Sequence, residues 1–140
     1  MPRTRVETRA RSRVLQALYA WDLRGEEQLE RVAQQVWDDL SVAPEERAFA
    51  GALIRTVARH RSDLDAQITE ATTNWRLERL SVIDRCVLRL GAAELHNGET
   101  PPRVVIQEAV RLAERYGSLK SAKFVNGVLD ALARRTGRLE

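Results

Sequence analysis

Arginines crowd the first residues of the chain, and their type and spacing suit the binding of a polyanion. Residues 1–13 contain Arg3, Arg5, Arg9, Arg11 and Arg13. A guanidinium can pair with a phosphate through two hydrogen bonds and can stack on a nucleobase. Five arginines and Glu7 give this segment a net charge of +4. Because the formal net charge of the whole chain is +3, the remaining residues have a net charge of −1. This basic arm is therefore either a phosphate-binding element or a solvated terminus.

A second candidate surface lies near the other end of the chain, in the run SAKFVNGVLD. Phe124 stands beside Lys120 and Lys123, and an exposed aromatic ring between lysines is a platform on which bases can stack. The alternative is that Phe124 belongs to the core at the edge of an apolar stripe. Asn126 and Gly127 are unusual inside a helix, since glycine costs about 1 kcal/mol relative to alanine there. A close helix crossing or a ligand contact would explain them.

Residue types that support catalysis or metal binding are sparse. His60 and His96 stand alone, without a second histidine or cysteine at the spacing of metal ligands. Cys86 is surrounded by apolar residues, which favours a buried and inert thiol. There is no glycine-rich phosphate loop and no nucleophile elbow. The sequence therefore predicts a non-catalytic protein without a cofactor or a metal site.

Composition places the chain among folded globular proteins. Hydrophobic residues make up 44% and charged residues 31% of the 140 residues, a length that suits one domain. The single cysteine permits no internal disulfide, which is compatible with a reducing compartment. No apolar run approaches about 18 residues and no apolar segment follows the first arginines. We therefore expect a cytoplasmic protein without a signal peptide or a membrane segment.

Helical periodicity extends over nearly the whole chain, because apolar residues recur at spacings of three and four. Gly25 ends the first predicted helix, and Ser62 and Ser81 each precede an aspartate by three residues, a pattern typical of helix starts. Thr100 is the expected cap of a helix whose first residue is Pro101. The expected helices cover residues 5–25, 27–40, 44–57, 62–68, 81–95, 101–117 and 118–135.

No segment shows the alternating pattern of a β-strand. About seven helices joined by short loops predict one all-α domain over residues 1–140, built as two packed helical bundles. The helix that follows Ser81 has apolar residues on so much of its circumference that we expect it at the centre. Gly91 within it would allow another helix to approach closely.

Four segments resemble, in order, the signature segments of the NusB family of bacterial transcription antitermination factors. They are RVLQALYAWDL, DRCVLRLGAAEL, PPRVVIQEAVRLAERYGS and SAKFVNGVLD. The resemblance extends over essentially the whole chain and implies two roughly perpendicular three-helix bundles. It also implies a non-catalytic adaptor that binds the single-stranded boxA sequence of nascent ribosomal RNA together with the ribosomal protein NusE. The complex then docks on RNA polymerase with other Nus factors.

The resemblance also assigns roles to individual residues. The arginine-rich RNA-binding element of the family falls on Arg9 and Arg11, with Arg5 and Arg13 as additions. An aromatic residue of the first helix matches Tyr19. The RNA surface near the C-terminal motif matches Lys120, Lys123, Phe124 and Asn126. The acidic position that faces NusE matches Asp84, with Glu78 nearby.

Alternatives of other classes exist. A protein-only helical scaffold would use its arginines to bind an acidic protein surface. A stand-alone relative of the RNA-binding domain of ribosomal RNA cytosine methyltransferases is less favoured, because the chain ends at Glu140 with no methyltransferase part. Some members of the NusB family dimerise across the RNA surface and others do not, and the sequence leaves a homodimer open.

Overall fold

The structure is a computed structural model that describes residues 5–25, 27–72 and 76–140. Within these residues it contains helices and no strand, which confirms the all-α class. The elements are α1 (Arg5–Arg24), α2 (Leu29–Asp39), α3 (Pro44–Ala71), a 3-10 helix η1 (Leu77–Arg79), α4 (Val82–Asn97), α5 (Pro102–Tyr116) and α6 (Leu119–Arg135). None of these helices is long and apolar enough to cross a membrane.

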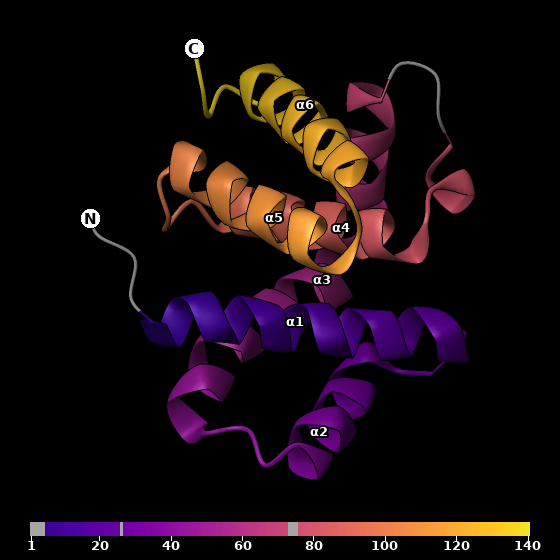
Figure 1. Cartoon of the computed structure of the whole chain (residues 1–140), viewed down its shortest axis with the longest axis vertical. Helices are drawn as coiled ribbons and strands as arrows, with labels where there is room; N and C mark the ends of the chain where they lie inside the picture. The colour runs from indigo at the N-terminus through magenta and orange to yellow at the C-terminus, as the bar shows by residue number, and fades with distance from the viewer. Residues whose placement is uncertain (1–4, 26, 73–75) are drawn as a thin grey trace.

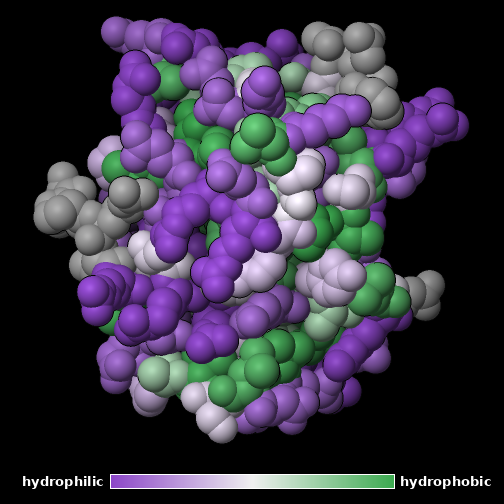
Figure 2. Space-filling view, viewed as in Figure 1, coloured by the Kyte–Doolittle hydropathy of each residue, from purple (hydrophilic) through white to green (hydrophobic). Residues whose placement is uncertain are grey.

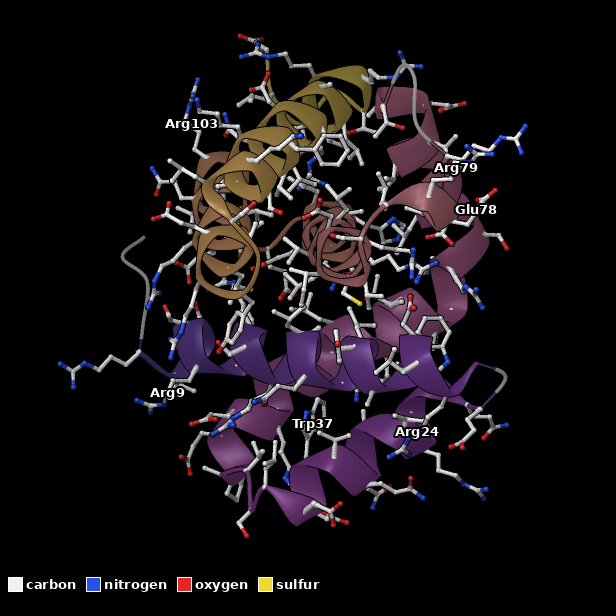
Figure 3. The ribbon with its side chains drawn as sticks, turned by 45° about the vertical axis from the view of Figure 1, so that its right-hand side comes forward. Arg9, Arg24, Trp37, Glu78, Arg79 and Arg103 are labelled. Carbon is white, nitrogen blue, oxygen red and sulfur yellow. The ribbon has the colours of Figure 1, made fainter. Side chains whose placement is uncertain are left out.

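The helices form two groups of three. Helices α1, α2 and α3 pack on one another, and so do α4, α5 and α6 (Figure 1). Helix α3 also contacts α4 and α6, so it joins the two groups. In Figure 3, α1 lies across the page while α4 is seen nearly end-on, and the two helices therefore cross steeply. This arrangement is the pair of three-helix bundles that the resemblance implies.

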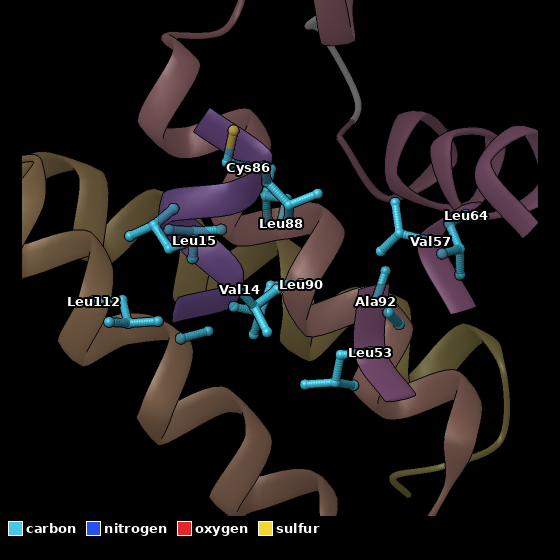
Figure 4. Close-up of a cluster of buried hydrophobic side chains, with 14 of the residues drawn as sticks. Val14, Leu15, Leu53, Val57, Leu64, Cys86, Leu88, Leu90, Ala92 and Leu112 are labelled. Atoms are coloured by element: carbon cyan, nitrogen blue, oxygen red, sulfur yellow. The ribbon is translucent and has the colours of Figure 1, made fainter. Parts of the chain in front are cut away.

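One hydrophobic core draws side chains from all six α-helices. Figure 4 shows Val14 of α1, Leu53 of α3, Leu90 of α4 and Leu112 of α5 among its members. Every residue of α4 from Cys86 to Leu95 is buried, which confirms α4 as the central helix. A Cβ atom on Gly91 would lie 2.6 Å from Cδ1 of Leu129, so the glycine permits the close packing of α6 on α4.

Two predicted helix starts are wrong. Residues 44–71 form one helix that bends at His60, whose backbone angles are φ −119° and ψ 21°. The predicted break between residues 57 and 62 thus coincides with the bend, but Ser62 lies inside α3 and does not cap a separate helix. Pro101, not Thr100, precedes α5: it has extended backbone angles, as a residue before a proline favours, and Pro102 opens the helix. Ser81 caps α4 as predicted, since its Oγ accepts a hydrogen bond from the Asp84 amide at 3.2 Å.

Candidate nucleic-acid interface

Residues 5–13 of the basic arm are part of α1. The helix begins at Arg5 and continues without a break to Arg24. The arginines from Arg5 to Arg13 therefore belong to a helix whose apolar face is buried in the core. Arg5 is exposed and makes no ion pair with another described residue. Arg3 lies outside the described residues. The anchoring explains why no glycine or proline separates the arm from the apolar part of the helix.

Arg9 and Arg13 converge on one carboxylate. The Nε atom of Arg9 donates to Oε2 of Glu46 at 2.9 Å, and Nε of Arg13 donates to Oε1 at 3.0 Å. Glu46 is buried in the first turn of α3, and the hydrogen bonds from Arg13 and Arg9 lower the pKa of its carboxyl group. The side chains of Arg9 and Arg13 remain 54% and 27% exposed. Glu46 thus fixes both arginines while their outer nitrogens face solvent or Gln16.

Arg11 does not face solvent, contrary to the role predicted for it. It is 1% exposed, and its guanidinium donates to both oxygens of Glu94 and, from Nη1, to Oε1 of Glu108 at 3.0 Å. Burial acts to lower the pKa of Arg11, but the hydrogen bonds and charge of Glu94 raise it. The physical reason is the position of Arg11 on the face of α1 that packs on α4 and α5. We therefore exclude Arg11 from the candidate surface.

The turn between α5 and α6 brings the second set of candidates next to α1. Figures 1 and 3 both place this turn directly above α1. Lys120, Lys123 and Asn126 are exposed on the first turns of α6. Tyr19, on α1, is 40% exposed. The exposed candidates from the two ends of the sequence thus belong to neighbouring elements.

Phe124 is only partly exposed. Its side chain packs against the hydrophobic core, as the alternative interpretation of this residue expected, and only part of it is accessible to a ligand. Gly127 is exposed, and a Cβ atom built on it would meet nothing within 4 Å. A close helix crossing therefore does not explain this glycine.

Two arginines and one tyrosine of α5 were missed by the sequence analysis. Arg111 and Arg115 are exposed and line a narrow seam with Thr8 and Ser12 of α1. Tyr116 follows the buried Leu112 by four residues, and therefore lies on the same face of the helix, yet it is 41% exposed. In Figure 2, hydrophilic residues dominate the surface over α5 and α6, and hydrophobic residues gather in smaller patches, one of them around α2. The available signal was the four-residue spacing of Arg111 and Arg115, which places both on one helix face.

The acidic candidates lie elsewhere. Glu78 is exposed on η1, and Figure 3 shows it on the opposite side of the molecule from Arg9. Asp84 lies in the first turn of α4, where its negative charge suits the positive end of the helix dipole. Its Oδ1 atom is buried and accepts no hydrogen bond from the described residues. Glu78 is therefore separated from the basic candidate Arg9.

A cleft of about 380 Å³ beside Glu78 contains a network of ion pairs. Nε and Nη2 of Arg85 donate to the two oxygens of Asp22, each at 2.7 Å, and Arg89 binds Asp65 of α3 at 2.9 Å. The hydrogen bond from Arg85 lowers the pKa of Asp22. The charged side chains pair with one another and connect α1, α3 and α4, which is a structural role.

The two histidines, which were expected to stand alone, lie next to each other in the structure. The rings of His60 and His96 lie 4.5 Å apart. No group of three potential metal ligands occurs in the part of the chain that the structure describes. Cys86 is buried, and burial raises the pKa of its thiol to about 12, so the thiol stays protonated at neutral pH.

Comparisons with known proteins agree with this architecture. The model of the NusB family matches residues 8–134. The transcription antitermination protein NusB of Sorangium cellulosum is 46% identical over 131 residues, which are 93% of each chain. That of Anaeromyxobacter dehalogenans strain 2CP-1 is 46% identical over 129 residues, 90% of this chain and 89% of the relative.

Solved structures are also similar to this chain. A crystal structure of the antitermination factors NusB and NusE in complex with double-stranded RNA contains a chain with a TM-score of 0.86 and 32% identity. The match covers 95% of this chain and 99% of that one. NusB of T. maritima has a TM-score of 0.85 and 36% identity, with 96% of this chain and 93% of that one covered.

Proposed function

The chain belongs to the NusB family of transcription antitermination proteins, and we propose that it binds the boxA sequence of nascent ribosomal RNA together with NusE. The RNA is single-stranded in this proposal, and the complex docks on the elongating RNA polymerase with other Nus factors. The protein works in the cytoplasm as a non-catalytic adaptor.

The observation that supports RNA binding best is the exposed basic surface on α1 and the α5–α6 turn. Arg5, Arg9 and Arg13 project from α1, and Lys120 and Lys123 project from the neighbouring start of α6. Arginine and lysine bind phosphates regardless of base sequence. Exposed aromatic edges at Tyr19 and Phe124, with the amide of Asn126, would add base contacts. Recognition of single-stranded RNA commonly combines these two kinds of contact.

We assign the contact with NusE to the acidic side of the molecule. Glu78 lies on the opposite side of the molecule from Arg9 (Figure 3), so NusE at Glu78 and RNA at the basic arm would not compete for one surface. Asp84, which is partly exposed in the first turn of α4, would add its negative charge to this contact. NusE raises the affinity for RNA because a second contact on the same RNA acts at a high effective concentration. A homodimer that covers the basic surface would compete with RNA.

A binding comparison separates this proposal from the protein-only scaffold. Fluorescence anisotropy is recorded with a boxA RNA and with a scrambled RNA of equal length, each with and without NusE. We expect weak binding of boxA RNA by the chain alone and tighter, sequence-dependent binding with NusE. Absence of binding in all four mixtures would contradict the proposal and favour the scaffold. Detection of methyl transfer by the chain would favour the methyltransferase-related alternative.

A further inference from the structure

The C-terminal end of α5 exposes a cation beside an aromatic ring. Arg115 and Tyr116 are both exposed, and the Arg115 guanidinium carbon lies 5.3 Å from the centre of the Tyr116 ring. Arg115 makes no ion pair with another described residue. A positive charge without a partner next to an accessible ring is suited to a ligand that is both anionic and aromatic.

This pair lies between the two basic groups that we assigned to RNA. Arg115 lines the seam between α5 and α1, across from Thr8 and Ser12. The hydroxyl of Thr8 donates to Oε1 of Glu108 at 2.9 Å, which fixes the two helices at this seam. On one side of Arg115 are therefore the arginines of α1, and on the other side, across the turn, is Lys120.

The turn that follows the pair has a defined shape. The Gly117 amide donates to the carbonyl of Ala113 at 2.9 Å, and a Cβ atom at Gly117 would lie only 2.7 Å from that oxygen. Ser118 then caps α6 by accepting a hydrogen bond from the Ser121 amide at 3.0 Å. Tyr116 and Lys120 are thus held at a fixed separation, as a preformed binding surface requires.

The charges around Arg115 leave it available. The buried carboxylate of Glu108 is engaged by Arg11 and Thr8, and Nη1 of Arg111 approaches its other oxygen at 3.8 Å. The contact with Glu108 partly compensates the positive charge of Arg111. The positive charge of Arg115 is not compensated by it. Glu114 is the neighbouring exposed acid, and it projects about 100° away from Arg115 around the helix axis.

We propose that Arg115 and Tyr116 form an RNA contact, in which Arg115 binds a backbone phosphate and a base stacks on the ring of Tyr116. The contact joins the arginines of α1 to the lysines of α6 in one continuous path for single-stranded RNA. Tyr116, which is more exposed than Phe124, would then be the main stacking platform. This inference rests on the proposed function and adds residues to its RNA surface.

The test measures the affinity of the full chain with NusE for boxA RNA as a function of salt. Arg115→Gln should weaken binding about threefold or more and reduce the slope of log K against log salt by about 0.7, the value for one phosphate of a single strand. Tyr116→Leu should weaken binding about fivefold or more with an unchanged slope, and Tyr116→Phe should bind normally. The matched control is Arg103→Gln, at the opposite end of the same helix, which should bind normally.

The outcomes separate this inference from the proposed function. Normal binding by Arg115→Gln and Tyr116→Leu, with weakened binding by Arg9→Gln, would overturn the contact and leave the proposed function in place. Equal losses in Arg115→Gln and Arg103→Gln would also overturn it, since they would indicate a general charge effect. Absence of RNA binding by the unaltered chain would contradict both. Circular dichroism of each variant verifies that it is folded.

Discussion

Arg11 of α1 binds Glu94 of α4 in the interior of the protein, with Nε donating to Oε1 at 2.9 Å. The pair joins the first three-helix group to the second. Because Glu108 of α5 binds the same guanidinium, one arginine compensates two buried carboxylates. Arg11 therefore belongs to the structural framework that carries the RNA surface, while its neighbours Arg9 and Arg13 belong to the surface itself.

Replacement of Arg11 should destabilise the fold. Arg11→Ala leaves Glu94 and Glu108 buried without their shared cation, and removal of one partner of a buried pair costs about 3–5 kcal/mol. Urea unfolding followed by circular dichroism measures the loss. The control is Arg5→Ala on the same helix, whose exposed and unpaired side chain should leave the midpoint unchanged. Equal midpoints for Arg11→Ala and the unaltered protein would contradict the structural role.

Stability should fall in acid. The pKa values of Asp22 and Glu46 are lowered in the folded protein by their arginine partners. A carboxyl group whose pKa is lower in the folded than in the unfolded protein stabilises the fold while it is ionised. This stabilisation is complete above the pKa of the unfolded state, about 4, and is lost as the pH falls through the pKa of the folded state. Unfolding free energies between about pH 7 and about pH 3 test this. Asp22→Asn should lower the stability at neutral pH and flatten its decline in acid, and an unchanged decline would exclude Asp22 as a source.

Two glycine substitutions should have opposite effects on stability. Gly91→Ala places a Cβ atom 2.6 Å from Leu129, and such overpacking costs about 1–3 kcal/mol. Gly127→Ala meets nothing within 4 Å and should stabilise α6 by up to about 1 kcal/mol, since alanine is the better helix former. Thermal unfolding distinguishes the two. If RNA approaches α6 at Gly127, this second variant should also bind boxA RNA less tightly, and normal binding would leave the glycine without a ligand role.

Charge reversal at Glu78 should affect NusE and not RNA. Glu78→Lys replaces a negative charge by a positive one on the surface that we assign to NusE. Loss of an attractive charge pair, or repulsion between like charges, weakens the association of two proteins. Titration calorimetry should show NusE affinity reduced by about tenfold, or 1.4 kcal/mol, while RNA binding in the absence of NusE stays the same. Arg79→Gln, at the neighbouring exposed residue, is the control for a local disturbance. Undiminished affinity of Glu78→Lys for NusE would move the interface elsewhere.

The helices were predictable because their signals are local. The spacing of apolar residues located α1, α4 and α6, and Ser81 and Ser118 each accept the hydrogen bond expected of a helix cap. The sequence predicted an interruption between residues 57 and 62, and the bend at His60 lies there, but it did not show that the helix resumes at once on the far side. Local signals in the sequence therefore predict which residues are helical. They do not show whether two consecutive helical segments form one continuous helix.

The division of the arginines required the tertiary structure. Arg9 and Arg11 look alike in the sequence, but the carboxylates that bury Arg11 are 83 and 97 residues away. Tyr116 fits the apolar period of its helix, yet it lies at the end of α5, where the following turn leaves it exposed. Whether such a residue is exposed depends on which helix faces pack against each other. The periodicity of the sequence does not show which faces those are.

The most direct test of the central claim is the salt dependence of boxA RNA binding by the chain with NusE. If the basic surface contacts about three to five phosphates, the slope of log K against log salt should be roughly −2 to −3.5. Arg9→Gln should make the slope shallower, whereas the exposed Arg59→Gln on α3 should not. An affinity that does not change with salt, or equal slopes for the unaltered protein and Arg9→Gln, would contradict the binding of RNA by this surface.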